Sequence, residues 1–264
     1  MLEQMVKFFL SGFIYPNITW LGLLWGIGLG VVFGAIWLAT YWPPLFKKWW
    51  LWAVLPASAA LGWAAVAFIQ IPLQYWSGQA LGHFWSQETL IQWLLLAGIP
   101  QILLTGLVQE GAKLVPVVFW RYRKGKNIAP KMALIIGATA GAGLGVFEAV
   151  WAHNTVFATG WSWEAVEAVG LLALTPFWER FFVVALHISL TALAGYGLAR
   201  GWGWQSYLVV AFLHSVTNYA VVLLQSGLLN PIQLEIYVAV IALAIMAAAL
   251  WLRWKKPRET VIRQ

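Results

Sequence analysis

Four ionisable side chains interrupt otherwise hydrophobic segments of this chain: Glu110, Glu148, His187 and His214. A charged group at the centre of a bilayer costs at least about 2.5–3.5 kcal/mol on insertion scales, so such residues usually face a protein interior and carry function. Two carboxylates and two imidazoles can transfer protons, activate a water molecule or bind a divalent metal. These four residues therefore form a candidate site, provided that the helices carrying them pack together.

Three further polar residues belong to this candidate site. Lys113 follows Glu110 by three positions, and Thr191 and Asn218 each follow one of the histidines by four. Such spacings place two side chains on the same face of a helix. Lys113 could keep Glu110 ionised as its ion-pair partner, and Asn218 could join His214 in donating hydrogen bonds to a developing oxyanion. We expect Thr191 to bond to the backbone of its own helix.

The distance from each residue to the basic end of its segment predicts its depth in the membrane. At 1.5 Å per helical residue, Glu110, His187 and His214 lie roughly 15–20 Å deep, near the midplane. Glu148 lies at roughly 24 Å by the same measure and so falls nearer the outer face. Glu179 and Arg180 precede His187 at the outer mouth, as either a surface ion pair or one that organises the site.

The composition predicts the class of protein. Of the 264 residues, 62% are hydrophobic and 9% are charged, and the mean hydropathy is +0.77. Because a soluble domain has about a quarter charged residues, we predict an all-α, polytopic membrane helix bundle. The chain has no cysteine, which excludes disulfides, a thiolate nucleophile and cysteine-bound metals.

Segments of about 20 apolar residues can cross a bilayer as helices. Seven occur, and we expect them to form a single transmembrane domain over residues 1–264. Pro100 and Pro116 are expected kink points, and Met1–Tyr15 is expected to be an interfacial helix or a partly inserted segment. The predicted spans are Trp20–Thr40, Trp50–Ile71, Leu90–Trp120, Met132–Phe157, Phe177–Ala199, Ser206–Leu224 and Pro231–Trp254.

The net charge is +7, but most of the basic residues lie in alternate loops and in the C-terminal tail, which argues against nucleic-acid binding. This distribution follows the positive-inside rule and predicts that the N-terminus lies outside and the C-terminus in the cytoplasm. We expect an integral protein of a prokaryotic plasma membrane. We expect contact with membrane lipid and none with nucleic acid. His83 and His153 are placed in or near outer loops. The basic residues in these regions include Lys47, Lys48, Arg121, Arg123, Lys124, Lys126, Lys131, Arg200, Arg253, Lys255, Lys256, Arg258 and Arg263.

A repeated glycine predicts close helix packing. Gly137, Gly141 and Gly145 recur every four residues in an apolar segment. Small residues at this spacing allow membrane helices to approach closely. A phosphate-binding loop is excluded, because no strand precedes the segment and no Lys-Ser/Thr follows it. The glycine face should bring Glu148, three residues further on, near the other helices.

Four motifs in order over about residues 100–220 resemble those of the PrsW and YhfC families. These are intramembrane proteases of the group that includes CAAX prenyl endopeptidases and bacteriocin-processing proteins. The families usually have a second glutamate where this chain has Gln109, so a two-carboxylate mechanism at this motif is not expected. The motifs are Gln109-Glu110-Gly-Ala-Lys113, Gly143-Leu-Gly145-Val-Phe147-Glu148, Glu179-Arg180…His187-Ile-Ser-Leu-Thr191 and His214-Ser-Val-Thr-Asn218.

The resemblance implies an endopeptidase that cuts in or near the membrane segment of a membrane-anchored substrate. That substrate would be a single-pass membrane protein or a membrane-associated peptide. The implied roles are water activation by Glu110, a second acid at Glu148, assistance or polarisation by His187 and His214, and an oxyanion site at Asn218, with Lys113, Arg180 and Thr191 in support.

Three alternatives stay open beside a protease without a cofactor. The first is a zinc-dependent form, with Glu110, Glu148, His187 and His214 as ligands, although an ammonium at Lys113 would oppose a dication. The second is a non-catalytic membrane scaffold or subunit that keeps the fold. The third is a transporter that uses the buried groups as a proton relay, although no repeat relates the two halves of the chain.

Overall fold

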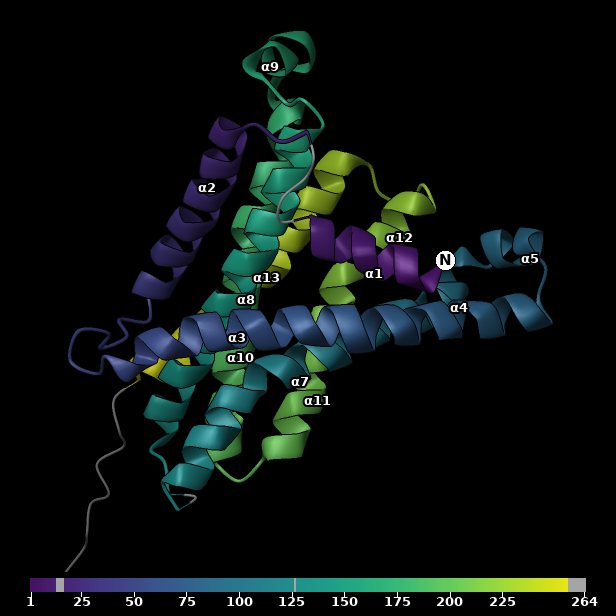
Figure 1. The fold of residues 1–264 in the computed structure, drawn as a ribbon. Coiled ribbons are helices and arrows are strands. Elements are labelled where there is room, and N and C mark those ends of the chain that lie inside the picture. Colours follow the sequence, from purple (N-terminus) through teal and green to yellow (C-terminus); the bar gives the residue numbers. More distant parts are fainter. Residues whose placement is uncertain (13–16, 126, 256–264) are drawn as a thin grey trace, which may run out of the picture.

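The computed structural model describes residues 1–12, 17–125 and 127–255, and these are almost entirely helical (Figure 1). Lys126 and the basic residues beyond Lys255 lie outside this description, as does part of the predicted N-terminal segment. The elements are α1 (Leu2–Ser11), α2 (Trp20–Ala39), α3 (Trp50–Ala65), the π-helix η1 (Val66–Gln70), α4 (Ile71–Phe84), α5 (Gln87–Gln92), α6 (Leu94–Ala97), α7 (Ile99–Arg123), α8 (Pro130–Ala158), α9 (Trp163–Val169), the 3-10 helix η2 (Gly170–Leu174), α10 (Thr175–Ala199), α11 (Gly203–Asn218), α12 (Ala220–Gln225) and α13 (Pro231–Trp254).

Seven helical segments in the described part of the chain are long and apolar enough to cross a membrane. The predicted all-α, polytopic membrane architecture is therefore confirmed, and each segment overlaps one predicted span. Two segments are longer than expected: one continues through η1 to Phe84, and another begins at Trp163 instead of Phe177. The first grows because its helix continues through a π-turn, and the second because α9 and η2 lead directly into α10.

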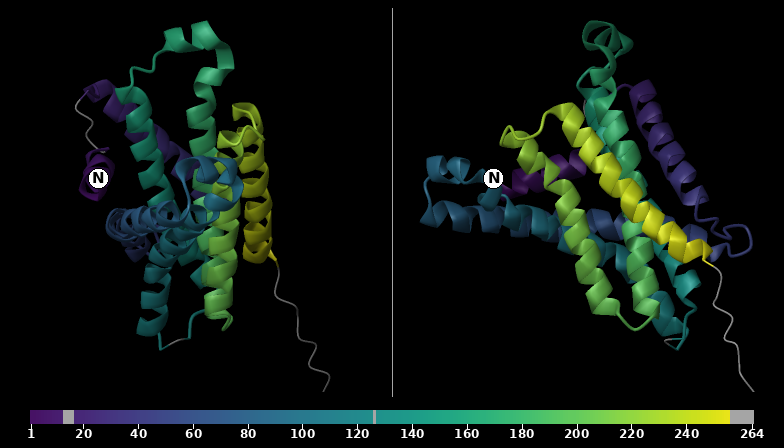
Figure 2. Two further views of the ribbon diagram at one scale, coloured as in Figure 1. Left: turned by 90° about the vertical axis from the view of Figure 1, so that its right-hand side faces the viewer. Right: turned by 180° about the vertical axis from the view of Figure 1, so that it is seen from behind.

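The α3–η1–α4 segment forms one long rod that crosses the helices behind it (Figure 1). Figure 2 shows this rod on one face of the bundle and α13 on the opposite face, with α8, α10 and α11 between them. The rod packs on α8 through α3 and on α7 through α3, η1 and α4. The π-turn at Val66–Gln70 therefore lies beside the helix that carries Glu110.

Both prolines that were expected to kink a helix lie in α7, and the described part of the N-terminal segment is helical. The helix break expected near Pro100 falls at Gly98, because Pro100 lies in the first turn of α7, where a missing N–H is tolerated. Helix α7 continues through Pro116 to Arg123. The N-terminal segment forms α1, in which no residue is buried, and it packs against η1 and α4.

Helices α8 and α10 form the centre of the bundle, and they approach closely through the predicted glycine face. A Cβ atom on Gly137 would lie 2.2 Å from the carbonyl oxygen of Thr191, and one on Gly141 would lie 2.3 Å from that of His187. The backbone of α10 thus rests directly on these glycines, which confirms the packing predicted for them. The contact fixes where α10 presents the His187 side chain.

Replacing Gly141 with alanine should therefore destabilise the bundle, because the new methyl group meets backbone that cannot rotate away. We expect Gly141→Ala to lower the free energy of unfolding by about 1–3 kcal/mol, the usual cost of overpacking. Thermal unfolding in detergent micelles measures this loss. Gly28→Ala is the matched control, since a Cβ at Gly28 meets nothing within 4 Å. Equal stabilities for the two variants would contradict the proposed packing.

Candidate active site

The centre of the candidate site is an ion pair that is completely buried. The Nζ atom of Lys113 lies 2.5 Å from Oε1 of Glu110, one turn earlier on α7, and both side chains are 0% exposed. The predicted pairing of these two residues is confirmed. The same Nζ atom lies 2.8 Å from Nδ1 of His187 on α10, so the ammonium joins two helices.

His214 approaches the same carboxylate from α11. Its Nδ1 atom lies 2.6 Å from Oε1 of Glu110, and the side chain is 2% exposed. The other carboxylate oxygen, Oε2, accepts a long bond of 3.5 Å from Thr191 Oγ1. Thr191 also donates to the carbonyl of His187 at 3.0 Å, which confirms its expected bond to its own helix. One oxygen of Glu110 therefore has two close donors, and the other has a single weak one.

Glu148 also belongs to the cluster. Its Oε2 atom lies 2.9 Å from Nε2 of His187, so the nearer-to-surface depth predicted for Glu148 does not separate it from the others. The carboxylate is 20% exposed, whereas His187 is 1% exposed. Glu148 is thus the member of the cluster nearest to the outside of the bundle.

The hydrogen bonds assign the proton positions on His187. An ammonium can only donate, so Nδ1 of His187 accepts from Lys113. The neutral ring then has its proton on Nε2 and donates it to Glu148. This proton assignment follows from which of the bonded groups can donate and which can accept a hydrogen bond.

The same reasoning applied to His214 leaves one ring nitrogen free. An ionised Glu110 can only accept, so Nδ1 of His214 donates to it. The second nitrogen, Nε2, then has a lone pair and makes no hydrogen bond to any residue that the structure describes. A carboxylate that holds one imidazole nitrogen while the other faces a reactant is the arrangement of general-base pairs in hydrolases.

A close contact between α7 and α11 brings Glu110 and His214 together. A Cβ atom on Gly106 would lie 2.2 Å from the carbonyl oxygen of Ala211 and 2.3 Å from Oγ of Ser215. Gly106 is one turn before Glu110, and Ser215 follows His214 directly. This glycine was not singled out from the sequence, because it stands alone and does not repeat.

The remaining predicted residues lie around the cluster. Arg180 pairs with Glu179, and their side chains are 19% and 29% exposed, so this ion pair is only partly buried. Asn218 is the last residue of α11, and within the described residues it makes no hydrogen bond to the cluster. His153 was expected in or near an outer loop, but it lies inside α8, five residues before that helix ends at Ala158, and its side chain is fully buried.

An amide network beside Glu110 was not predicted. The Nε2 atom of Gln109 donates to Oε1 of Gln70 at 3.2 Å, and Gln74 donates to Oγ1 of Thr105 at 2.9 Å. The network links α7 to η1 and α4. Scattered glutamines in apolar segments gave no periodic signal, and their meeting depends on the π-turn that ends at Gln70.

The residues could gather around a metal ion, but Lys113 opposes it. One donor atom from each of Glu110, His187 and His214 lies within 4.8 Å of the others. The ammonium of Lys113, however, bonds to two of these three residues, so it would lie close to any dication at the centre. The fourth predicted ligand, Glu148, bonds to the far nitrogen of His187. The observed arrangement therefore does not fit a divalent metal.

Removing the ammonium should leave two buried groups without their partner. We expect Lys113→Met to lower the free energy of unfolding at neutral pH by about 3–5 kcal/mol, the usual cost of breaking a buried ion pair. The double variant Glu110→Gln/Lys113→Met should be more stable than Lys113→Met alone, since it removes the uncompensated charge. Unfolding in detergent micelles measures both, and Lys7→Met, from an exposed pair on α1, is the control. A Lys113→Met protein as stable as the control would contradict the assigned pairing.

The chain was compared with protein-family models, with characterised proteins and with solved structures, and none of the three comparisons found a match. The resemblance to the PrsW and YhfC families therefore stays a prediction from four short motifs.

Proposed function

We propose that this protein is an intramembrane endopeptidase that hydrolyses a peptide bond in or near the membrane segment of a single-pass membrane protein or a membrane-associated peptide. The observation that carries the proposal is the buried bond of 2.6 Å between His214 and Glu110, in a bundle with seven candidate membrane spans. A carboxylate–imidazole pair with a free nitrogen is chemically suited to activate water. The order of the four motifs supports a peptide as the substrate.

In the proposed reaction, Nε2 of His214 removes a proton from water, and the resulting hydroxide attacks the carbonyl carbon of the peptide. Glu110 holds the imidazole and stabilises the imidazolium that forms, as the carboxylate does in catalytic triads. The imidazolium then returns its proton to the leaving amine as the C–N bond breaks. The sequence suggested Glu110 itself as the base, but its Oε1 atom already accepts hydrogen bonds from Lys113 and His214, which favours an orienting role.

Lys113 completes this mechanism. Its ammonium has three N–H donors, of which two bond to Glu110 and His187. The third can donate to the oxyanion that develops on the substrate carbonyl, and charged donors of this kind strongly stabilise such intermediates. His187, held in turn by Glu148, keeps the ammonium in place. Asn218 can add a second oxyanion donor from the end of α11.

The non-catalytic scaffold and the zinc-dependent protease are the alternatives that the experiments must separate. A scaffold needs the buried cluster only for stability. A zinc enzyme needs Lys113 to be displaced or neutral, which the bonds described above disfavour. We therefore propose the form without a metal.

Substitution of the proposed base pair should abolish cleavage by the folded protein, and rates are compared at equal amounts of folded protein because Glu110→Gln also leaves the Lys113 ammonium without its carboxylate. We expect Glu110→Gln and His214→Asn each to lower kcat by about 10²–10⁴-fold, the usual contribution of a general base. The double variant should be no slower than the slower single variant, because the two residues act as one unit. New peptide N-termini in membranes from cells that express the protein identify the cleaved bond, and a reporter built on that bond measures the rates.

His83→Asn is the matched control for these substitutions, since His83 is exposed on α4. Wild type and Glu110→Gln are compared at equal amounts of folded protein. If the two proteins give the same set of N-termini, the enzymatic proposal fails and the protein is a scaffold. A chelator added to the purified protein separates the two protease forms: loss of cleavage that zinc restores would rule out the metal-free mechanism.

We also propose that the protein lies in a prokaryotic plasma membrane with its N-terminus outside and its C-terminus in the cytoplasm. The chain has no cysteine, so a single introduced cysteine is the one thiol that a labelling reagent can reach, and its labelling reports on which side of the membrane it lies. We expect Thr159→Cys, in the loop after α8, to react with a membrane-impermeant maleimide on intact cells, and Lys124→Cys, after α7, to react only after lysis. The reverse pattern would invert the proposed orientation.

A further inference from the structure

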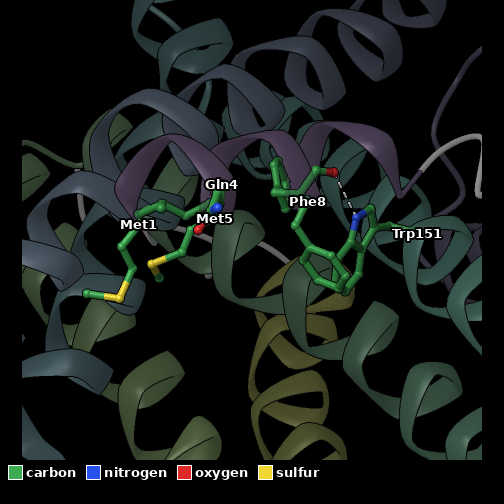
Figure 3. A pocket seen from close by; sticks show the side chains of 7 residues that line it. Met1, Gln4, Met5, Phe8 and Trp151 are labelled. Carbon is green, nitrogen blue, oxygen red and sulfur yellow. Dashed lines mark hydrogen bonds between the residues drawn. The ribbon is translucent and has the colours of Figure 1, made fainter.

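An open-sided cavity of about 440 Å³ lies beneath α1, where this helix meets the bundle. Met1, Met5 and Phe8 line it from α1, and Ile71 and Trp151 line it from the bundle. Figure 3 shows the two methionine side chains and the Trp151 ring below the α1 ribbon, with the indole N–H of Trp151 donating to the Phe9 carbonyl at 3.0 Å. The walls are apolar except for the amide of Gln4.

Two residues that line this cavity are close in sequence to residues in or beside the candidate active site. Trp151 follows Glu148 by three residues on α8, so the two side chains share a helix face. Ile71 follows Gln70, which accepts a hydrogen bond from Gln109, the neighbour of Glu110. Two separate elements, α8 and the η1–α4 segment, therefore link the cavity to the cluster, and Glu148, the most exposed of the bonded cluster residues, is one helical turn from a residue that lines the cavity.

The amide side chain of Gln109, beside the cluster, suits a peptide backbone. A peptide bond must be unwound before water can attack it, and each backbone N–H or C=O freed inside a membrane costs several kcal/mol unless it finds a partner. Gln109 is 6% exposed, and its Oε1 atom has no hydrogen-bond partner among the described residues. A backbone N–H of an unwound substrate could satisfy it, whereas a lipid acyl chain could not.

The wall of the cavity that α1 provides can adapt to different side chains. Methionine is unbranched and flexible, and it is common on surfaces that bind varied apolar partners. No residue of α1 is buried, and Met5 and Phe8 remain 40% and 54% exposed. A displacement of α1 would therefore expose no buried residue of that helix.

A second cavity, of about 510 Å³, does not share these features. It is lined only by apolar and aromatic residues of α2, α8, α10 and the segment between α8 and α10, including Trp25, Leu29 and Phe157. Phe157 is nine residues beyond Glu148, roughly 13 Å along the helix. This cavity provides a matched comparison of similar size.

We infer that the cavity beneath α1 binds the apolar segment of the substrate next to the bond that is cut, and that Gln109 bonds to the unwound backbone between the cavity and the cluster. The inference deepens the proposed function and rests on it. The substrate is then a transmembrane peptide whose residues flanking the cut are apolar, with the helix already weakened there.

Cross-linking tests the binding without requiring cleavage. The probe is a synthetic peptide of about 20 leucine and alanine residues, with a central glycine pair and one cysteine near it, placed in nanodiscs with the Glu110→Gln protein. We expect oxidation to link the probe to Met5→Cys, and not to Leu29→Cys in the second cavity. No link at position 5, or equal links at both positions, would overturn the inference.

Kinetics provides the second measurement. In the otherwise wild-type protein, Met5→Trp fills the cavity and should raise KM for the cleaved reporter by roughly tenfold or more, with kcat unchanged. Leu29→Trp, the control, should leave both constants unchanged. An unchanged KM for Met5→Trp would overturn the inference, as would a phospholipid that co-purifies with wild type and is lost in Met5→Trp.

The outcomes separate this inference from the proposed function. If the Glu110→Gln substitution leaves all cleavage unchanged, the protease proposal fails, whatever the cross-links show. If Glu110→Gln abolishes cleavage but the probe does not link at position 5, the protease proposal stands and only the cavity assignment is wrong.

Discussion

The ammonium of Lys113 is the constraint on which the rest of the site depends. A fully buried cation among membrane-spanning helices is stable only if its donors are satisfied inside the protein. One carboxylate on its own helix supplies part of this, and the imidazole of His187 supplies the rest. Each of those partners then needs a partner of its own, and His214 and Glu148 provide them. Five titratable groups from four helices thus form one continuous chain.

This chain of bonds can form only where helix backbones approach closely. Gly141 lets α10 rest on α8, and Gly106 lets α11 rest on α7. In each case a side chain of the site lies within two turns of the glycine. Packing between backbones, and not loop geometry, therefore sets the distances in the site. Sites built on packed helices hold their groups more precisely than sites on loops.

Much of this arrangement could be predicted from the sequence, for identifiable reasons. Hydropathy gave all seven spans, because membrane helices carry a strong and simple signal. The repeat of Gly137, Gly141 and Gly145 predicted their close contact, and the spacing of Glu110 and Lys113 predicted their pairing. The meeting of Gly106 with α11 was missed because a single glycine has no period. The π-turn and the glutamine network could not be found, since no local pattern marks where a helix gains an extra residue in one turn.

The π-turn at Val66–Gln70 also sets how the side chains of α4 are oriented around the axis of the rod. In an α-helix each residue advances by about 100° around the axis, so one residue more or less in this turn rotates α4 by that amount relative to α3. With the turn present, Gln70 faces Gln109 and Ile71 faces the cavity beneath α1. A straight α-helix of the same residues would turn both away. The five residues of the π-turn therefore determine which face of α4 packs against the rest of the protein.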